Sequence, residues 1–124
     1  MDRILIIDDS VVQANMLTAI LEEDYAITQA HTAEDGLNWA RGGDFSLILL
    51  DVVMPEMDGF GLLRKLQEEV VTQHTPVILI TSLRDVEHEE WGLTLGAVDY
   101  ITKPYHPHIV RARVNTHIKL YHYW

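Results

Sequence analysis

Short apolar runs alternate with longer stretches in which apolar and polar residues repeat at helical spacing. The runs at residues 4–7, 47–50 and 77–80 consist entirely of Ile, Leu and Val, and a shorter run lies at 100–102. Runs this short, without polar alternation, predict strands that are covered on both faces of a sheet. The segment 25–30 indicates one more strand, which makes five.

Signals for helix starts and ends lie between these runs. Ser10 suits the N-cap of a first helix, and Thr32 with Asp35 resembles a capping box that opens a second. The Gly42-Gly43 pair should end that second helix. The apolar residues expected to share one side of the first helix are Ala14, Leu17, Ile20 and Leu21.

Three further helices follow. The stretch 86–95 predicts a fourth helix that Gly96 ends, and His106-Pro107 suits the N-cap and first turn of a fifth. Five strands alternating with five helices predict one doubly wound α/β domain over residues 1–124. Asp58 should open the third helix, whose apolar residues are expected to face the sheet: Leu62, Leu63, Leu66 and Val70.

Composition narrows the class of protein. Hydrophobic residues make up 48% of the 124 residues and charged residues 23%, as in ordinary globular domains. Nineteen acidic residues against nine basic ones give a net charge of −10, which argues against direct nucleic-acid binding by this domain. The absence of cysteine excludes disulfides, cysteine-bound zinc and thiol catalysis, and the seven histidines lack metal-ligand spacing.

Location follows from the same reading. The N-terminus shows no signal pattern, and no segment approaches the roughly 20 apolar residues of a membrane helix. We therefore expect a cytoplasmic protein without membrane association.

Polar residues come directly after the predicted strands. Asp8 and Asp9 follow the first run, Asp51 the second, Thr81 the third, and Lys103 follows the last. In a parallel sheet these residues would meet at the carboxyl edge, where open α/β sheets bind their ligands. Because three carboxylates in a small space need a compensating cation, the pattern predicts a divalent metal site beside a phosphate-handling lysine.

Taken together, these residues resemble a known family. Asp8-Asp9, Asp51, the segment Met-Pro-Glu-Met-Asp-Gly at 54–59, Thr81 and Lys103-Pro104 resemble the receiver domain of two-component response regulators over essentially the whole chain. The resemblance implies a flavodoxin-like topology with a five-stranded parallel sheet in the order 2-1-3-4-5.

The resemblance also implies a metal-dependent phosphorylation. Asp51 would accept a phosphoryl group from a phosphohistidine on a sensor histidine kinase or a histidine phosphotransfer protein. Mg²⁺ would be held by Asp9 directly, by Asp8 largely through water, by Asp51 and by the backbone carbonyl of Val53. The domain would then be no enzyme beyond catalysing its own phosphorylation and dephosphorylation.

Further roles follow from the same resemblance. Thr81 would donate a hydrogen bond to a phosphoryl oxygen, Lys103 would pair with another, and the Lys103-Pro104 bond would be cis. Tyr100 matches an aromatic switch residue that rotates inward when Thr81 moves toward the phosphoryl group. The alternative, which we favour less, is an ordinary tyrosine of an amphipathic strand.

The output surface would consist of the fourth helix, fifth strand and fifth helix. Asp99 and Arg113 match one salt-bridge pair of dimers that use this surface, whereas Glu89 and Thr94 depart from the pattern. If a homodimer forms through this surface, we therefore expect its geometry to differ from that of those dimers. Trp91 is either an exposed contact there or part of the core.

Two apolar residues predict a long-lived phosphorylated state. Val53 and Leu83 occupy positions that influence how water reaches the aspartyl phosphate in the family, and neither can orient a water by hydrogen bonding. We therefore expect slow self-dephosphorylation.

Alternatives remain at this stage. Asp8 and Asp9 could merely cap a helix, and Lys103 could be a solvated loop residue. Rival functions are a metal-dependent phosphatase or phosphotransferase, a flavodoxin-like electron carrier, and a receiver that binds partners without phosphorylation. The apolar, aromatic ending at 120–124 fits either a domain cut from a longer protein with a C-terminal output domain or a terminus packed on its own domain.

Overall fold

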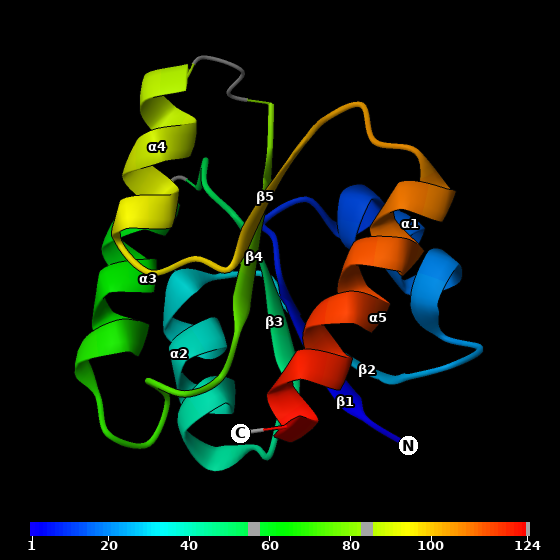
Figure 1. Ribbon diagram of the computed structural model, residues 1–124, viewed down its shortest axis with the longest axis horizontal. Coiled ribbons are helices and arrows are strands. Elements are labelled where there is room, and N and C mark those ends of the chain that lie inside the picture. The colour runs from blue at the N-terminus through cyan, green and yellow to red at the C-terminus, as the bar shows by residue number, and fades with distance from the viewer. Residues whose placement is uncertain (55–57, 83–85, 124) are drawn as a thin grey trace.

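The computed structural model describes residues 1–54, 58–82 and 86–123, and within them five strands alternate with five helices (Figure 1). The elements are β1 (Arg3–Ile7), α1 (Val11–Leu21), β2 (Ala26–Ala30), α2 (Ala33–Gly42), β3 (Leu47–Asp51), α3 (Gly59–Glu68), β4 (Val77–Thr81), α4 (Val86–Thr94), β5 (Asp99–Thr102) and α5 (Pro107–Tyr123).

All neighbouring strands are parallel, and the sheet has the order β2-β1-β3-β4-β5. Ile6 lies opposite Gln29 of β2 on one side and Leu49 of β3 on the other. The strand order and the doubly wound fold expected from the sequence are therefore confirmed. The strands β3 and β4 are buried along their whole length, and each is apolar up to its last residue, Asp51 or Thr81.

Helices cover both faces of the sheet (Figure 1): α1 and α5 lie on one side, and α2, α3 and α4 lie on the other. Alternate residues of each strand point to opposite faces. Accordingly Ile4 and Ile6 belong to the core under α1 and α5, whereas Leu5 and Ile7 belong to the core under α2 and α3. Burying each such side chain contributes about 1.5–3 kcal/mol to stability, so both faces of the sheet are stabilised by apolar packing.

Side-chain caps start the helices where the sequence predicted. The Ser10 hydroxyl accepts a hydrogen bond from the Gln13 N–H at 3.2 Å, and the Thr32 hydroxyl accepts one from Asp35 at 3.1 Å. An Asp58 carboxylate oxygen accepts from the Gly61 N–H at 2.8 Å. These caps satisfy backbone donors that the first helical turn leaves unpaired.

The predicted end of α3 is wrong. The helix ends at Glu68, and Val70 is 79% exposed rather than facing the sheet. The backbone becomes extended at Glu69, and the buried Thr72 hydroxyl donates to the Leu66 carbonyl at 2.7 Å. This side-chain bond satisfies a carbonyl of the last helical turn, so the chain leaves the helix before Val70 could take its place on the apolar side.

The remaining boundaries follow the sequence closely. β2 begins at Ala26, one residue after the predicted start, and Gly96 follows α4 with a φ of +112°. His106 precedes α5 as expected, and its ring Nδ1 accepts from the His108 N–H at 3.2 Å. No helix of the described ranges is long and apolar enough to cross a membrane.

Candidate functional site

Three carboxylates meet at the carboxyl edge of the sheet. Asp8 and Asp9 follow β1, and Asp51 ends the adjacent strand β3. The chain runs outward from β1 to β2 and returns to β3, so this edge is the topological switch point at which α/β sheets bind ligands. One carboxylate oxygen from each residue lies within 4.8 Å of the others.

Local hydrogen bonds fix the two buried carboxylates. Asp8 is 2% exposed and Asp51 is 8% exposed, whereas Asp9 is exposed. An Asp8 oxygen accepts from the Ser10 N–H at 2.9 Å, and an Asp51 oxygen accepts from the Val53 N–H at 3.2 Å. Each carboxylate therefore keeps a second oxygen for another partner.

Lys103 brings a positive charge to the buried acids. Its Nζ lies 3.6 Å from an Asp8 oxygen and 3.7 Å from an Asp51 oxygen. Its backbone N–H donates to the Thr81 carbonyl at 2.7 Å, and the Lys103-Pro104 bond is cis as expected. One lysine against three carboxylates leaves the cluster with a surplus of negative charge.

Burial and this surplus charge together shift the pKa of Asp51. Burial, followed by the charge of Asp8, raises the pKa of Asp51 from 3.8 to about 6, although Lys103 and the Val53 N–H oppose the shift. The carboxylate is thus poorly stabilised in the metal-free protein. A divalent cation would restore the balance.

The donor set suits a hard cation. Carboxylate oxygens are the ligands that Mg²⁺ prefers, and a partly exposed site leaves room for the waters that Mg²⁺ retains. Asp8, Asp9 and Asp51 fit this requirement on geometry and chemistry. Val53 lies at the same edge, and the role of its backbone carbonyl as a ligand stays a prediction.

Thr81 and Tyr100 lie on the neighbouring strands. Asp51 is paired in register with Ile80, so Thr81 stands one residue further along β4 and is fully buried. Tyr100 lies on β5 opposite Leu79 and is 5% exposed, in the core beneath α4. The positions suit the expected roles, and the roles themselves stay predictions.

On the α4-β5-α5 surface, the two residues that match a salt-bridge pair of dimers contact each other within the chain, and the dimer itself stays a prediction. Arg113 contacts one oxygen of Asp99 at 3.1 Å, and His117 contacts the other at 3.0 Å. Trp91 is 48% exposed, which places it at the surface of α4 rather than in the core. The sequence offered no signal for the contact with His117, because 18 residues separate it from Asp99.

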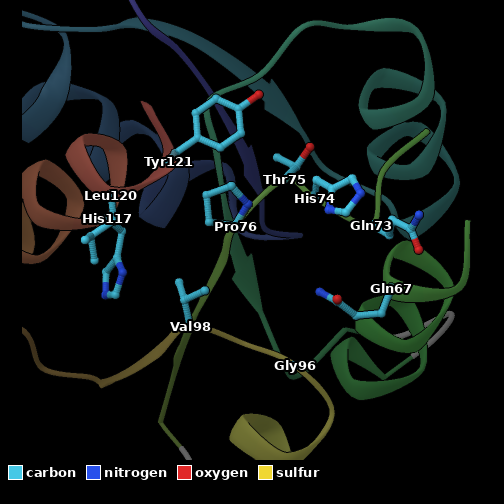
Figure 2. A pocket seen from close by; sticks show the side chains of 10 residues that line it. All are labelled: Gln67, Gln73, His74, Thr75, Pro76, Gly96, Val98, His117, Leu120 and Tyr121. Carbon is cyan, nitrogen blue, oxygen red and sulfur yellow. The ribbon is translucent and has the colours of Figure 1, made fainter. Parts of the chain in front are cut away.

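A separate cavity of about 390 Å³ lies at the opposite, amino edge of the sheet, between the end of α3 and α5 (Figure 2). Pro76, Val98 and Leu120 supply apolar surface, and Gln67 reaches toward it from α3. Neither carboxylates nor Lys or Arg line it, which distinguishes it from the acidic cluster at the carboxyl edge.

Part of the expected site lies outside the described residues. This applies to residues 55–57 of the Met-Pro-Glu-Met-Asp-Gly segment and to Leu83, one of the two residues expected to slow dephosphorylation.

Comparisons with known proteins agree with this geometry. A family model described as the response regulator receiver domain matches residues 4–115. A probable cyclic di-GMP phosphodiesterase of Vibrio cholerae is 36% identical over 94% of this chain, and protein PilH of Pseudomonas aeruginosa is 39% identical over 84% of it. The crystal structure of a CheY-like receiver domain protein from Methanospirillum hungatei superposes with a TM-score of 0.91 and 30% identity, covering 98% of this chain and 97% of that one.

The relatives differ in length. The chain spans 26% of the phosphodiesterase and 51% to 52% of two other curated relatives, whereas it spans 87% of PilH.

Proposed function

Because the chain belongs to the response regulator receiver domain family of two-component systems, we propose that Asp51 is its phosphoacceptor. The donor is a phosphohistidine on a sensor histidine kinase or a histidine phosphotransfer protein. The observation that carries the proposal is the cluster of Asp8, Asp9 and Asp51 with Lys103 at the carboxyl edge.

The proposed reaction is a displacement at phosphorus. The Asp51 oxygen that faces Lys103 attacks, while the phosphorus–nitrogen bond breaks and the released imidazole takes up a proton. Asp8, Asp9, Asp51 and the Val53 carbonyl would hold Mg²⁺, which would neutralise charge on the phosphoryl oxygens. Positioning and neutralisation are nearly all that this reaction asks of a protein.

Lys103 and Thr81 bind the transferred group. Lys103 already faces the Asp51 carboxylate and pairs with one phosphoryl oxygen, while the Thr81 hydroxyl donates to another. Movement of Thr81 then permits a shift of Tyr100 on the neighbouring strand. This changes the populations of two arrangements of the α4-β5-α5 surface rather than the fold.

The α4-β5-α5 surface is the part of the domain that would contact partners. We propose that it contacts an output domain or forms a homodimer, with Trp91 and the exposed acidic residues of α4 available for contact. A longer protein with a C-terminal output domain is supported by the relatives in which the matched part is a quarter or half of the length. We therefore place this domain, with its output partner and its phosphoryl donor, in the cytoplasm.

Catalysis is confined to the domain's own phosphorylation and dephosphorylation. Family membership disfavours a stand-alone phosphatase and an electron carrier of the flavodoxin type. The exposed, apolar Val53 beside Asp51 supports slow self-dephosphorylation, because its side chain cannot orient an attacking water.

The test uses the protein, MgCl₂ and acetyl phosphate, with intact mass as the readout. Wild-type protein should gain one phosphoryl group, and Asp51→Asn or an excess of EDTA should abolish the gain. Asp44→Asn, which removes an exposed carboxylate elsewhere, should behave like wild type. A folded wild-type protein that binds Mg²⁺ but gains no mass would refute the proposal in favour of a phosphorylation-independent interaction domain.

A further inference from the structure

The helix α4 packs on the sheet through a glycine. Of the residues of α4, all of which lie within the described ranges, Gly92 alone is buried, whereas Val86, Trp91 and Leu93 are 75%, 48% and 43% exposed. A surface helix normally packs through a stripe of apolar side chains, as α3 does in this protein. Because α4 buries so little apolar surface, few contacts fix its position, and such an element shifts at a low cost in free energy.

Gly92 lies close against three side chains of the core. A Cβ at this position would lie 2.5 Å from Leu79 Cδ1, 3.3 Å from Phe60 Cε1 and 3.5 Å from Tyr100 Cδ2. Leu79 and Tyr100 are buried and are paired in register on β4 and β5. The shortest of these distances is closer than a real Cβ comes to another atom, so a larger residue would displace either Leu79 or the helix. Glycine is a poor helix former, and this close approach is a packing reason for its place within α4.

The backbone of Gly92 is also joined to the segment that enters β5. Its carbonyl accepts a hydrogen bond from the Ala97 N–H at 3.1 Å, two residues before Asp99 begins the strand. In the first half of α4, the ring of His88 stacks on Phe60 with 6.1 Å between the ring centroids. The C-terminal half of the helix is therefore anchored beside Tyr100, at the point where Gly92 meets the core.

We propose that Gly92 is a positioning residue of the switch, which places α4 against Tyr100 so that a movement of this ring displaces the helix. The role rests on the proposed function, in which a shift of Tyr100 follows phosphorylation of Asp51, and it adds the contact through which α4 responds. A side chain at position 92 would hold the helix away from the Tyr100 ring. Gly92 takes no part in metal binding or phosphoryl transfer and acts through Tyr100.

The test combines acetyl phosphate and MgCl₂ with two readouts, intact mass for phosphorylation and ¹H–¹⁵N NMR for α4. The indole N–H of Trp91, assigned by its loss in Trp91→Phe, reports on the helix beside Gly92. In wild type this signal should shift as the phosphorylated fraction grows. Gly92→Ala should still gain one phosphoryl group but should lose most of the Trp91 shift. Gly42→Ala, where a Cβ meets no atom within 4 Å, should keep the full shift.

A compensating variant separates the close approach from a general disturbance of α4. Leu79→Val removes the Cδ1 atom that a methyl group at position 92 would meet at 2.5 Å. The double variant Gly92→Ala/Leu79→Val should therefore recover the Trp91 shift, and Leu79→Val alone should keep it. Because alanine favours the helix, Gly92→Ala should fold, and its melting curve checks this. Should it unfold, the double variant compared with Leu79→Val decides, since equal shifts are expected.

The outcomes distinguish this role from the proposed function. A full Trp91 shift in Gly92→Ala, or a shift still missing from the double variant, would overturn the role of Gly92. Wild-type protein that gains the phosphoryl group without any Trp91 shift would also overturn it and would leave Asp51 as the phosphoacceptor. Folded wild-type protein that gains no mass would refute the proposed function and, with it, this role.

Discussion

At the residue scale, the chemistry depends on a carboxylate held where it is poorly solvated. Asp51 is 8% exposed, beside Asp8 and within 3.7 Å of Lys103. One lysine does not offset both burial and the neighbouring acids, so the pKa of Asp51 rises to about 6. The metal-free protein therefore stores an unfavourable charge at the position where a cation and a phosphoryl group would bind.

This stored charge predicts that Asp51→Asn stabilises the metal-free protein at neutral pH. The folded-state pKa of Asp51 lies above its ordinary value of 3.8, so folding favours the protonated carboxyl. Its contribution to the free energy of unfolding is fully present below pH 3.8 and is lost as the pH rises through about 6. The variant should exceed wild type by roughly 2 kcal/mol in free energy of unfolding above pH 6, and by almost nothing below pH 4.

Urea unfolding in EDTA at several pH values measures this difference. Asp44→Asn, at an exposed position, controls for the loss of one negative charge. Adding Mg²⁺ should stabilise wild type selectively, since the variant lacks one ligand. A difference between wild type and variant that does not change with pH would contradict the assignment.

Val53 gives a second prediction at this scale. It is 54% exposed and follows Asp51 by two residues, so an amide placed there could hold a water near the aspartyl phosphate. Val53→Asn should shorten the lifetime of the phosphorylated protein by about tenfold, less than the 10²–10⁴ of a direct general base. Decay of the phosphorylated mass measures the lifetime.

Val70→Asn provides the matched control for that experiment. It introduces the same amide at a 79% exposed position beyond α3, away from the acidic cluster, and should leave the lifetime unchanged. Equal lifetimes for Val53→Asn and wild type would show that the apolar side chain does not limit access of water.

At the scale of elements, the start of α3 is tied to the end of β3. The Gly59 N–H donates to the Val52 carbonyl, and a Cβ on Gly59 would lie 2.5 Å from the Val52 Cα and 2.6 Å from the Asp51 carbonyl oxygen. Both neighbours are backbone atoms that cannot rotate away. The helix can approach the phosphoacceptor strand this closely only with glycine at its first position.

Gly59→Ala should therefore destabilise the protein by about 1–3 kcal/mol in urea unfolding and weaken Mg²⁺ binding through displacement of Asp51. Gly42→Ala is the control, because a Cβ there meets no atom within 4 Å. That change should be neutral or stabilise by up to about 1 kcal/mol. Equal stabilities of the two variants would show that the close approach at α3 can relax at no cost.

At the scale of the whole molecule, the sheet separates two cores and exposes two different edges. The carboxyl edge gathers the acids and Lys103, whereas the cavity at the amino edge has a lining without charged side chains. Tyr100 of β5 lies in the core beneath α4, and Asp99 of the same strand forms a salt bridge with Arg113 of α5. If the proposed function holds, phosphorylation at the carboxyl edge changes the α4-β5-α5 surface by a shift between two arrangements and not by a change of fold.

The sequence by itself determined the architecture, because unbroken apolar runs, caps such as Ser10 and Thr32, and the stop at Gly96 act locally and agree with one another. It also predicted which acids would gather, since parallel strands present their carboxyl ends at one edge. The end of α3 before Val70 was not predicted. The apolar periodicity extends to Val70, but the hydrogen bond from the Thr72 hydroxyl to the Leu66 carbonyl ends the helix earlier.

Only the tertiary structure decided the energetics of the site. The raised pKa of Asp51 depends on burial and on charges from β1 and the end of β5, and the close approach of Gly59 to β3 depends on how α3 packs against the sheet. The pairing of Asp99 with His117 has the same origin. Local patterns specify which elements form, but the charge, burial and partners of each group are set by what the fold packs around it.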